Sequence, residues 1–284
     1  MLNHTAKALM AAFLALSVLA APAVYAEAEA EAAEAAEEAT AETSAAKKTE
    51  LENSVGAGIF LKKLAFENME GRTGILAEKP LYSAFAEEVI IRDFFQDREG
   101  GFFLDVGAAW AVKASNTYYL EKNLGWTGIG IDALIDYAPE WEEKRPNSKF
   151  ANYLITDKSG GEGVFYKSES LGLSSTKKDM AQGKMFGGKK EPEEIRVPMI
   201  TLNDLLDKEG VKKVDLISMD IEGHEPAAFA GFDIERFAPD LLVVEGKNKW
   251  VKEYLKEHGY AQIERYKKFD SVNGYYARAD EIDQ

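Results

Sequence analysis

The sequence predicts an α/β fold around a mostly parallel sheet. Apolar, strand-like segments alternate with amphipathic, helix-like segments from residue 102 onward, and such β-α-β units place their strands in parallel. Four of the strand-like segments also end in a carboxylate residue. The length of 284 residues and the hydrophobic content of 46% suit one large domain with a packed core, or one domain with an appendage.

The first β-α-β unit opens the predicted sheet. An apolar strand is predicted over 102–107, a helix over 115–124 and a second strand over 127–132. Ser115 can cap the helix, and Gly125 can end it.

The remaining elements continue the alternation. Helices, several of them bounded by Thr201, Gly210 or Gly259, are predicted over 55–69, 81–95, 137–144, 202–209, 224–230 and 250–258. Strands are predicted over 149–154, 163–167, 214–220 and 240–245, with a terminal hairpin formed by 260–266 and 275–278. Residues 168–193, rich in glycine, serine and lysine, are predicted to be a mobile loop.

The first 26 residues have the composition of an export signal. Lys7 is followed by the apolar run Ala8–Ala21 and then by small residues up to Ala26. This order is typical of a secretory signal peptide, cleaved after Ala26 or, alternatively, after Ala23. The run of 14 residues is short for a bilayer span of ~20 residues, and an uncleaved anchor is the alternative. We expect an exported protein, periplasmic or secreted, without stable membrane insertion after cleavage.

Residues 27–52 differ sharply from the sequence on either side. They consist mainly of alanine, glutamate and threonine and contain no aromatic residue. Such a segment buries little apolar area, so we expect a disordered linker or a frayed helix. The globular sequence then divides into an N-terminal helical segment, 53–101, and the main domain, 102–284.

The charge and the missing residue types exclude several functions. The net charge of −15 opposes binding to nucleic-acid phosphates, so we expect no nucleic-acid partner. The chain has no cysteine, which excludes disulfides, zinc–thiolate sites, iron–sulfur clusters and cysteine nucleophiles. It has three histidines, His4, His224 and His258, too few for a typical multi-histidine site, and we predict no metal site.

Four predicted strands end in a carboxylate: Asp105, Asp132, Asp220 and Glu245. In open α/β sheets, ligands bind in the crevice outside the carboxyl ends of the strands. Each acid alone could instead cap the helix that follows it. Because all four fall at the same edge of the predicted sheet, together they favour a ligand site there.

The first turn, 105–111, favours a cationic ligand. Gly107 allows a ligand to approach the backbone, and Asp132, which follows 25 residues later, could bind the two hydroxyls of a ribose. The turn has only one glycine, however, and Asp105 before it would repel a pyrophosphate. S-adenosylmethionine fits these residues, because it carries an ammonium, a sulfonium and a ribose but no phosphate.

Several motifs follow one another in a fixed order. They are residues 103–108 (Phe-Leu-Asp-Val-Gly-Ala), 115–118, 120–121, 125–129 and 152–157, and the most specific ones are 201–206 and 214–225. In this order, from about Tyr82 to Arg278, the sequence resembles the FkbM family of S-adenosylmethionine-dependent methyltransferases. The resemblance implies a class I methyltransferase (Rossmann-like) fold with a seven-stranded, mostly parallel sheet and a C-terminal antiparallel hairpin, beside the N-terminal helices. It also implies methyl transfer, often to a hydroxyl oxygen of a sugar or natural product.

The resemblance further implies roles for single residues. Contacts with the cofactor are implied for Asp105, Gly107, Ala109, Asn116, Asp132 and Asp157. The first three would line the methionine end, Asp132 would hold the ribose, and Asp157 would lie near the adenine. Asp220 and Glu222 would lie where the methyl group leaves.

The chain departs from the family pattern at three places. Trp110-Ala111 stands where the family has an acidic residue and a glycine, Ser83-Ala84 where it has serine and glutamine, and Glu87-Glu88 where it has glutamate and aspartate. Trp110 could block the cofactor pocket or stack on its edge.

A hydroxyl acceptor needs a base to remove its proton. The candidates are Asp220, Glu222, His224 and Glu245. His224 could instead be a contact at the start of a helix, and Glu245 could instead orient Lys247 or Asn248.

Two classes of function remain open. The first is an O-methyltransferase that acts on a small-molecule or glycan substrate of the envelope. The second is an exported methyltransferase-fold protein without turnover that acts as a binding module. Export favours the second, because S-adenosylmethionine is made inside cells. The retained strand-end acids favour the first.

Overall fold

The computed structural model describes residues 81–85, 87–169, 171–183 and 190–282. The predicted leader (1–26), linker (27–52) and helix 55–69 lie outside the described residues. All described residues belong to one compact unit, Ala65–Gln284. None of the helices among them combines the length and the apolar character that a membrane span requires.

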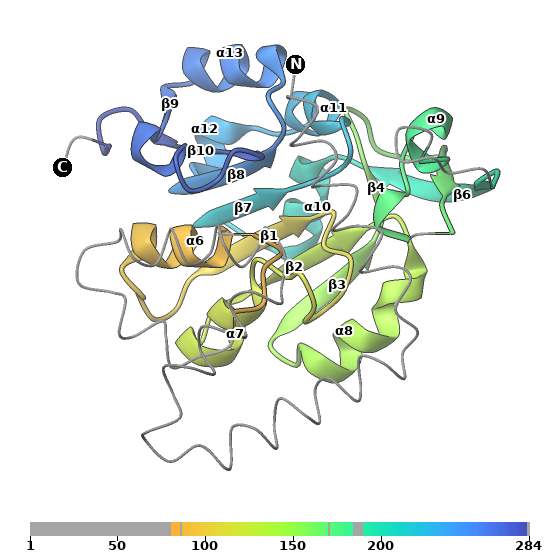
Figure 1. The fold of residues 1–284 in the computed structure, drawn as a ribbon, viewed down its shortest axis with the longest axis horizontal. Helices are drawn as coiled ribbons and strands as arrows, with labels where there is room; N and C mark the ends of the chain where they lie inside the picture. The colour runs from red at the N-terminus through yellow and green to blue at the C-terminus, as the bar shows by residue number, and fades with distance from the viewer. Residues whose placement is uncertain (1–80, 86, 170, 184–189, 283–284) are drawn as a thin grey trace, which may run out of the picture. The chain divides into compact units, whose positions relative to one another are not determined.

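A seven-stranded sheet forms the centre of this unit, in the order β3-β2-β1-β7-β8-β10-β9 (Figure 1). The strands are β1 (Phe102–Val106), β2 (Thr127–Asp132), β3 (Ser148–Asn152), β7 (Leu216–Met219), β8 (Leu241–Glu245), β9 (Tyr260–Gln262) and β10 (Asn273–Arg278). β10 runs antiparallel to β8 and β9, and the other neighbouring strands are parallel. The predicted seven-stranded, mostly parallel sheet with a C-terminal antiparallel hairpin is therefore confirmed.

Helices cover both faces of this sheet, because successive residues of a strand point to opposite faces. On β1, Phe103 shares a core with α6 (Glu87–Phe95) and α7 (Tyr118–Leu124), whereas Leu104 belongs to the core on the other face. The helices of that other face are α10 (Leu202–Glu209), α11 (Glu225–Ala230), α12 (Ile234–Phe237) and α13 (Lys249–Glu257). α8 (Ala138–Lys144) covers β2, and its Trp141 ring lies against Gly130.

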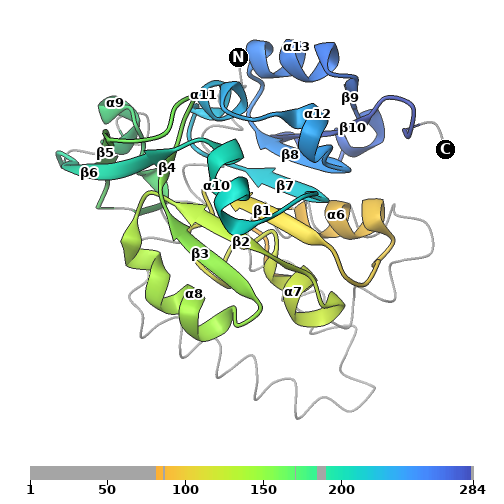
Figure 2. The same ribbon diagram turned by 180° about the vertical axis from the view of Figure 1, so that it is seen from behind.

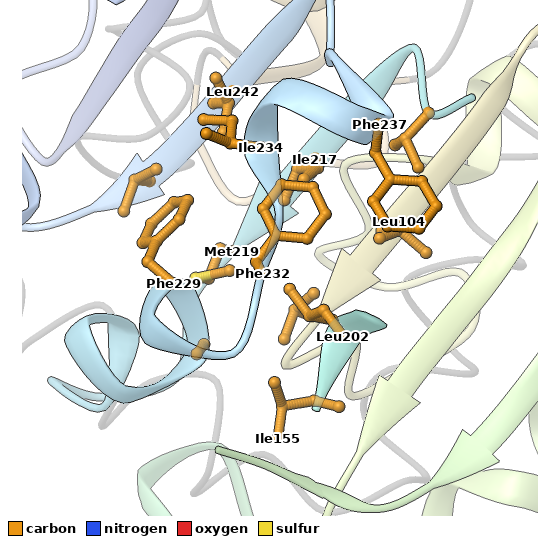
Figure 3. Close-up of a cluster of buried hydrophobic side chains, with 14 of the residues drawn as sticks. Leu104, Ile155, Leu202, Ile217, Met219, Phe229, Phe232, Ile234, Phe237 and Leu242 are labelled. Carbon is orange, nitrogen blue, oxygen red and sulfur yellow. The ribbon is translucent and has the colours of Figure 1, made fainter. Parts of the chain in front are cut away.

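The larger core lies between the sheet and helices α10 to α13 (Figure 3). Leu104, Ile217 and Leu242 come from three neighbouring strands and pack with Phe229 and Phe237, and all five side chains are fully buried. Burying one such side chain contributes about 1.5–3 kcal/mol. The core therefore holds β1, β7 and β8 in fixed positions, together with the residues at their carboxyl ends.

A smaller sheet follows the end of β3 (Figure 2). Its order is β4-β6-β5, with β4 (Leu154–Ile155), β5 (Glu162–Lys167) and β6 (Glu193–Ile200). The prediction of one strand over 149–154 is wrong, because the chain leaves the large sheet at Tyr153 and enters the small one. β6 is not predicted from the sequence, although Ile195, Val197 and Met199 alternate with less apolar residues, because Pro198 argues against a paired strand.

The predicted loop over 168–193 contains regular structure in its described part. A 3-10 turn, η2 (Leu171–Leu173), and the short helix α9 (Lys178–Ala181) lie within it. The predicted short strand over 163–167 is present as β5.

Several predicted boundaries shift by a few residues. The predicted helix 81–95 begins only at Glu87, and Ser83 instead forms a β-bridge with Ala114. α7 begins at Tyr118, whose backbone N–H donates to Ser115 Oγ at 3.1 Å. Helix α12 has only four residues, Ile234–Phe237, and no sequence pattern predicts it.

Replacing Thr201 with alanine should lower the free energy of unfolding by about 1 kcal/mol. As predicted, Thr201 caps α10: its Oγ1 accepts a hydrogen bond from the backbone N–H of Asp204 at 3.1 Å. Denaturant titration measures the loss. Thr201→Ser keeps the hydroxyl and should retain most of the stability, and an equal loss in both variants would contradict the cap.

Candidate active site

The four strand-end acids lie along one edge of the large sheet. Asp105 lies near the end of β1, Asp132 ends β2, Asp220 follows β7 and Glu245 ends β8. β2, β1, β7 and β8 are consecutive parallel neighbours in the sheet. The acids also interact electrostatically: the charge of Asp105 contributes to raising the pKa of both Asp132 and Asp220. The structure therefore places them where the sequence analysis expects the ligand crevice.

Gly107 brings the turn after β1 against the turn after β7. Its φ is +83°, a conformation that favours glycine. A Cβ atom at this position would lie closer than 3.0 Å to the backbone carbonyl of Asp220. Gly107 N–H also donates to the carbonyl of Ile131 in β2 at 2.8 Å. One small residue thus lets three neighbouring strand ends meet.

Asp132 joins the first turn to the end of β2. Its two carboxylate oxygens accept hydrogen bonds from the backbone N–H groups of Ala109 (3.1 Å) and Leu134 (2.8 Å). Ala109 has a φ of +44°, so alanine occupies a left-handed position in this turn. Burial raises the pKa of Asp132 to about 6, although the backbone donors oppose the shift.

Asp105 is more deeply buried, with 6% of its surface exposed. Its Oδ2 accepts a hydrogen bond from Thr117 Oγ1 at 2.6 Å. Burial raises the pKa of Asp105 to about 6, while the Thr117 hydrogen bond and the charge of Arg145 oppose the rise. Oδ1 accepts no hydrogen bond from any residue that the structure describes and is not sealed from solvent, so this oxygen is free for a ligand.

Asn116 and Asp157 lie differently from the other implied cofactor residues. Asn116 Nδ2 donates to Ser218 Oγ in β7 at 3.0 Å, so it ties the start of α7 to the neighbouring strand. Asp157 is exposed, follows β4 of the small sheet and accepts a hydrogen bond from Thr156 Oγ1. Among the described residues, Asp157 shares no hydrogen-bond partner with Asp105 or Asp132.

Three of the four candidate bases form a cluster, which we call the carboxyl cluster: Asp220, Glu222 and Glu245. One oxygen from each lies within 4.8 Å of the others. Burial is the main cause that raises the pKa of Glu222 to about 8 and that of Glu245 to about 7. The Asp220 side chain is exposed, and desolvation followed by the charge of Glu245 raises its pKa above the usual value.

The carboxyl cluster holds protons at neutral pH. The pKa of Glu222 is about 8, and burial and then the charge of Glu245 raise the pKa of Asp220 well above its usual value, so these two carboxyl groups favour their protonated forms near neutral pH. The three oxygens are also close enough for one divalent cation to contact them all, and oxygen ligands are those that Mg²⁺ and Ca²⁺ prefer. Glu245 thus lies beside Asp220, with oxygens within 4.8 Å of each other, while Asn248 caps α13 by accepting from Trp250 N at 2.9 Å.

His224 stands apart from the carboxyl cluster. Its Nδ1 lies 3.5 Å from Thr176 Oγ1, and its buried Nε2 finds no hydrogen-bond partner among the described residues. Burial lowers its pKa, so the ring is neutral at neutral pH. It occupies the first position before α11, but its side chain makes no capping hydrogen bond.

Glu225 is a site residue that the sequence analysis misses. It is 1% exposed, and its Oε1 accepts from the backbone N–H groups of Ile221 (3.3 Å) and Gly223 (3.0 Å). These bonds fix the turn that presents Glu222, whose φ is +54°. The Glu-Pro pair at the start of a predicted helix is the only sequence signal for this role.

Trp110 packs at the side of the first turn. Its ring meets Tyr137 edge to face, with centroids 5.6 Å apart, and a Cβ on Gly172 would lie 3.2 Å from the indole. Asp105 and Asp132 each keep some exposed surface, so the indole does not seal them off. Lys177, which like Gly172 lies in the described part of the segment between β5 and β6, donates from Nζ to the carbonyl of Gly223 at 3.2 Å. This segment therefore contacts both the first turn and the turn after β7.

A comparison with protein families matches this chain to the methyltransferase FkbM domain over residues 105–261. The match covers more than half of the chain and includes Asp105, Asp132, the carboxyl cluster and Glu225. A search of curated proteins found no match. The family match supports methyltransferase activity in general, and the chain belongs to the FkbM methyltransferase family.

Proposed function

We propose that this protein transfers a methyl group from S-adenosylmethionine to a hydroxyl oxygen of a sugar or other small molecule. The observation that carries the proposal is the row of carboxyl groups at the ends of β2, β1, β7 and β8. Asp105 and Asp132 lie at the first turn, and the carboxyl cluster lies at the ends of the neighbouring strands β7 and β8.

The residues at the first turn fit this cofactor. Asp105 Oδ1 is free to accept a hydrogen bond from an ammonium group. Asp132 uses each oxygen once for the backbone, and an ionised carboxylate has about four acceptor sites, so it can still accept the ribose hydroxyls. A cation bound here would also favour the ionised forms of both acids, whose pKa values burial raises to about 6.

The carboxyl cluster fits the role of a general base. Glu222 and Glu245 have pKa values of about 8 and about 7, close to a neutral working pH, where a base combines availability with driving force. When bound, the cofactor supplies an electrophilic methyl group. The chain's own contribution is to hold the acceptor hydroxyl in line and to take up its proton at a carboxylate oxygen.

We also propose that the protein acts outside the cytoplasm, from the leader-like sequence of residues 1–26. The alternative function is an exported methyltransferase fold that binds a ligand without turnover. The two functions differ in whether the site binds the cofactor.

Calorimetric titration of the full chain with S-adenosylmethionine should show binding, and Asp132→Ala should weaken it at least ~10-fold, since charged hydrogen bonds contribute about 1.5–3 kcal/mol each. Asp136→Ala is the matched control. Asp136 is exposed and pairs with Lys167 at the surface, where such a pair contributes little. Absence of heat from the unaltered chain at millimolar cofactor would favour the binding-module function.

A further inference from the structure

Arg145 occupies a fully buried position behind the first turn. Its Nε pairs with Glu121 Oε2 at 2.5 Å, and both side chains are almost completely shielded from solvent. Nη1 donates to the carbonyl of Ala111 at 3.0 Å, and Nη2 donates to Thr117 Oγ1 at 3.1 Å. One guanidinium thus holds both the backbone of the cofactor turn and the side chain that bonds to Asp105.

The direction of these hydrogen bonds is fixed by their chemistry. A guanidinium only donates, so Thr117 Oγ1 accepts from Arg145. The single hydroxyl proton of Thr117 is then available for Asp105 Oδ2, 2.6 Å away. A chain of this kind polarises each successive bond and stabilises an ionised carboxylate at its end. Glu121 balances the charge of Arg145 from the other side.

We infer that Arg145 and Thr117 are positioning residues that hold Asp105 in one orientation and in its ionised form, with Oδ1 left open for the cofactor. The inference rests on the proposed function, in which Asp105 binds the ammonium group. Without these hydrogen bonds, the Asp105 carboxylate could rotate about its side-chain bonds. Burial would then raise its pKa further, because less would oppose it.

The charges around Asp105 make this support necessary. Asp132 and Asp220 are its acidic neighbours, since its charge raises the pKa of each. Arg145 is the cation that opposes the effect of burial on Asp105. Removing the Thr117 hydroxyl takes away the largest opposing contribution, so the pKa of Asp105 should rise above about 6.

The test measures S-adenosylmethionine affinity of the full chain by calorimetry from pH 5 to pH 9. In the unaltered protein, affinity should fall as the pH drops through about 6, where Asp105 and Asp132 take up protons. Thr117→Val keeps the shape but loses the hydroxyl. If the pKa of Asp105 rises by one unit, the variant's affinity should be about 10-fold weaker than that of the unaltered protein at pH 5 and about 2-fold weaker at pH 7, and the two should match at pH 9. Thr117→Ser should behave like the unaltered protein.

A second measurement separates this inference from the proposed function. Carbon NMR of labelled aspartates, with Asp105 assigned by its loss in Asp105→Asn, gives the pKa of Asp105 without any ligand. A higher pKa in Thr117→Val and an unchanged one in Thr117→Ser support the inference. An unchanged pKa in Thr117→Val, or an affinity loss that is equal at every pH, overturns it. Absence of binding by the unaltered protein would overturn the proposed function, whereas the NMR result still decides the role of Thr117.

Discussion

Replacing Gly107 with alanine should abolish S-adenosylmethionine binding and lower the free energy of unfolding by about 3 kcal/mol or more. Two causes add. The φ of +83° is unfavourable for a residue with a Cβ atom, and that atom would overlap the backbone carbonyl of Asp220. A backbone group cannot rotate away as a flexible side chain can. Either the turn after β1 or the turn after β7 must move, and both carry site residues.

Gly210→Ala is the matched control for this prediction. Gly210 ends α10 with a φ of +72°, and no described atom lies within 4 Å of its Cβ position. Alanine there should therefore cost only the left-handed conformation, about 1 kcal/mol, and leave cofactor binding unchanged. Denaturant titration and calorimetry on both variants give the comparison. Similar losses in the two variants would show that the approach of Asp220 to Gly107 contributes nothing.

The edge of the sheet could be predicted from the sequence because its signals are local. Asp105, Asp132 and Glu245 each stand at the end of an apolar segment, and parallel strands bring their carboxyl ends to one edge. The boundaries of α10 could also be predicted, because Thr201 and Gly210 are residues that typically begin and end a helix. In each case, one short stretch of sequence contains the whole signal.

The interactions between distant segments could not be predicted in this way. Arg145 reaches Thr117 across 28 residues and the carbonyl of Ala111 across 34, and nothing in the sequence near Arg145 indicates these partners. The separation of His224 from the carboxyl cluster is a similar case. A histidine two residues after Glu222 looks like part of the same site, but the left-handed Glu222 and Gly223 turn the chain between them.

Tertiary packing also determines what happens at Trp110, where the sequence differs from the family pattern. The sequence leaves two outcomes open, a blocked pocket or packing at its edge. The structure places the indole against Tyr137 and Gly172, and Gly172 lies in the segment between β5 and β6, which the sequence predicts to be a loop. The residues next to Trp110 in the sequence therefore do not determine where the indole packs. Its position depends on β5, β6 and the segment between them.

The raised pKa values of the carboxyl cluster have a consequence for stability. The pKa of Glu222 rises from 4.5 to about 8 on folding, so the folded protein binds a proton more tightly than the unfolded chain does. The stabilising contribution is fully present below pH 4.5 and is lost as the pH rises through about 8. Glu245, Asp105 and Asp132, with pKa values of about 7, 6 and 6, act in the same direction. The ligand-free protein should therefore become less stable from pH 5 to pH 9.

Glu222→Gln should remove part of this loss and stabilise the ligand-free protein by about 2–3 kcal/mol at pH 9, less than the full pKa shift implies because neighbouring carboxyls titrate together. Near pH 4.5 the variant and the unaltered protein should unfold alike. Denaturant titrations across this pH range measure the difference. Glu142→Gln, an exposed glutamate on α8, makes the same change in net charge and should alter the pH dependence little. A Glu222→Gln curve parallel to that of the unaltered protein would mean that Glu222 ionises freely. The carboxyl cluster would then lack the raised proton affinity that suits a base near neutral pH.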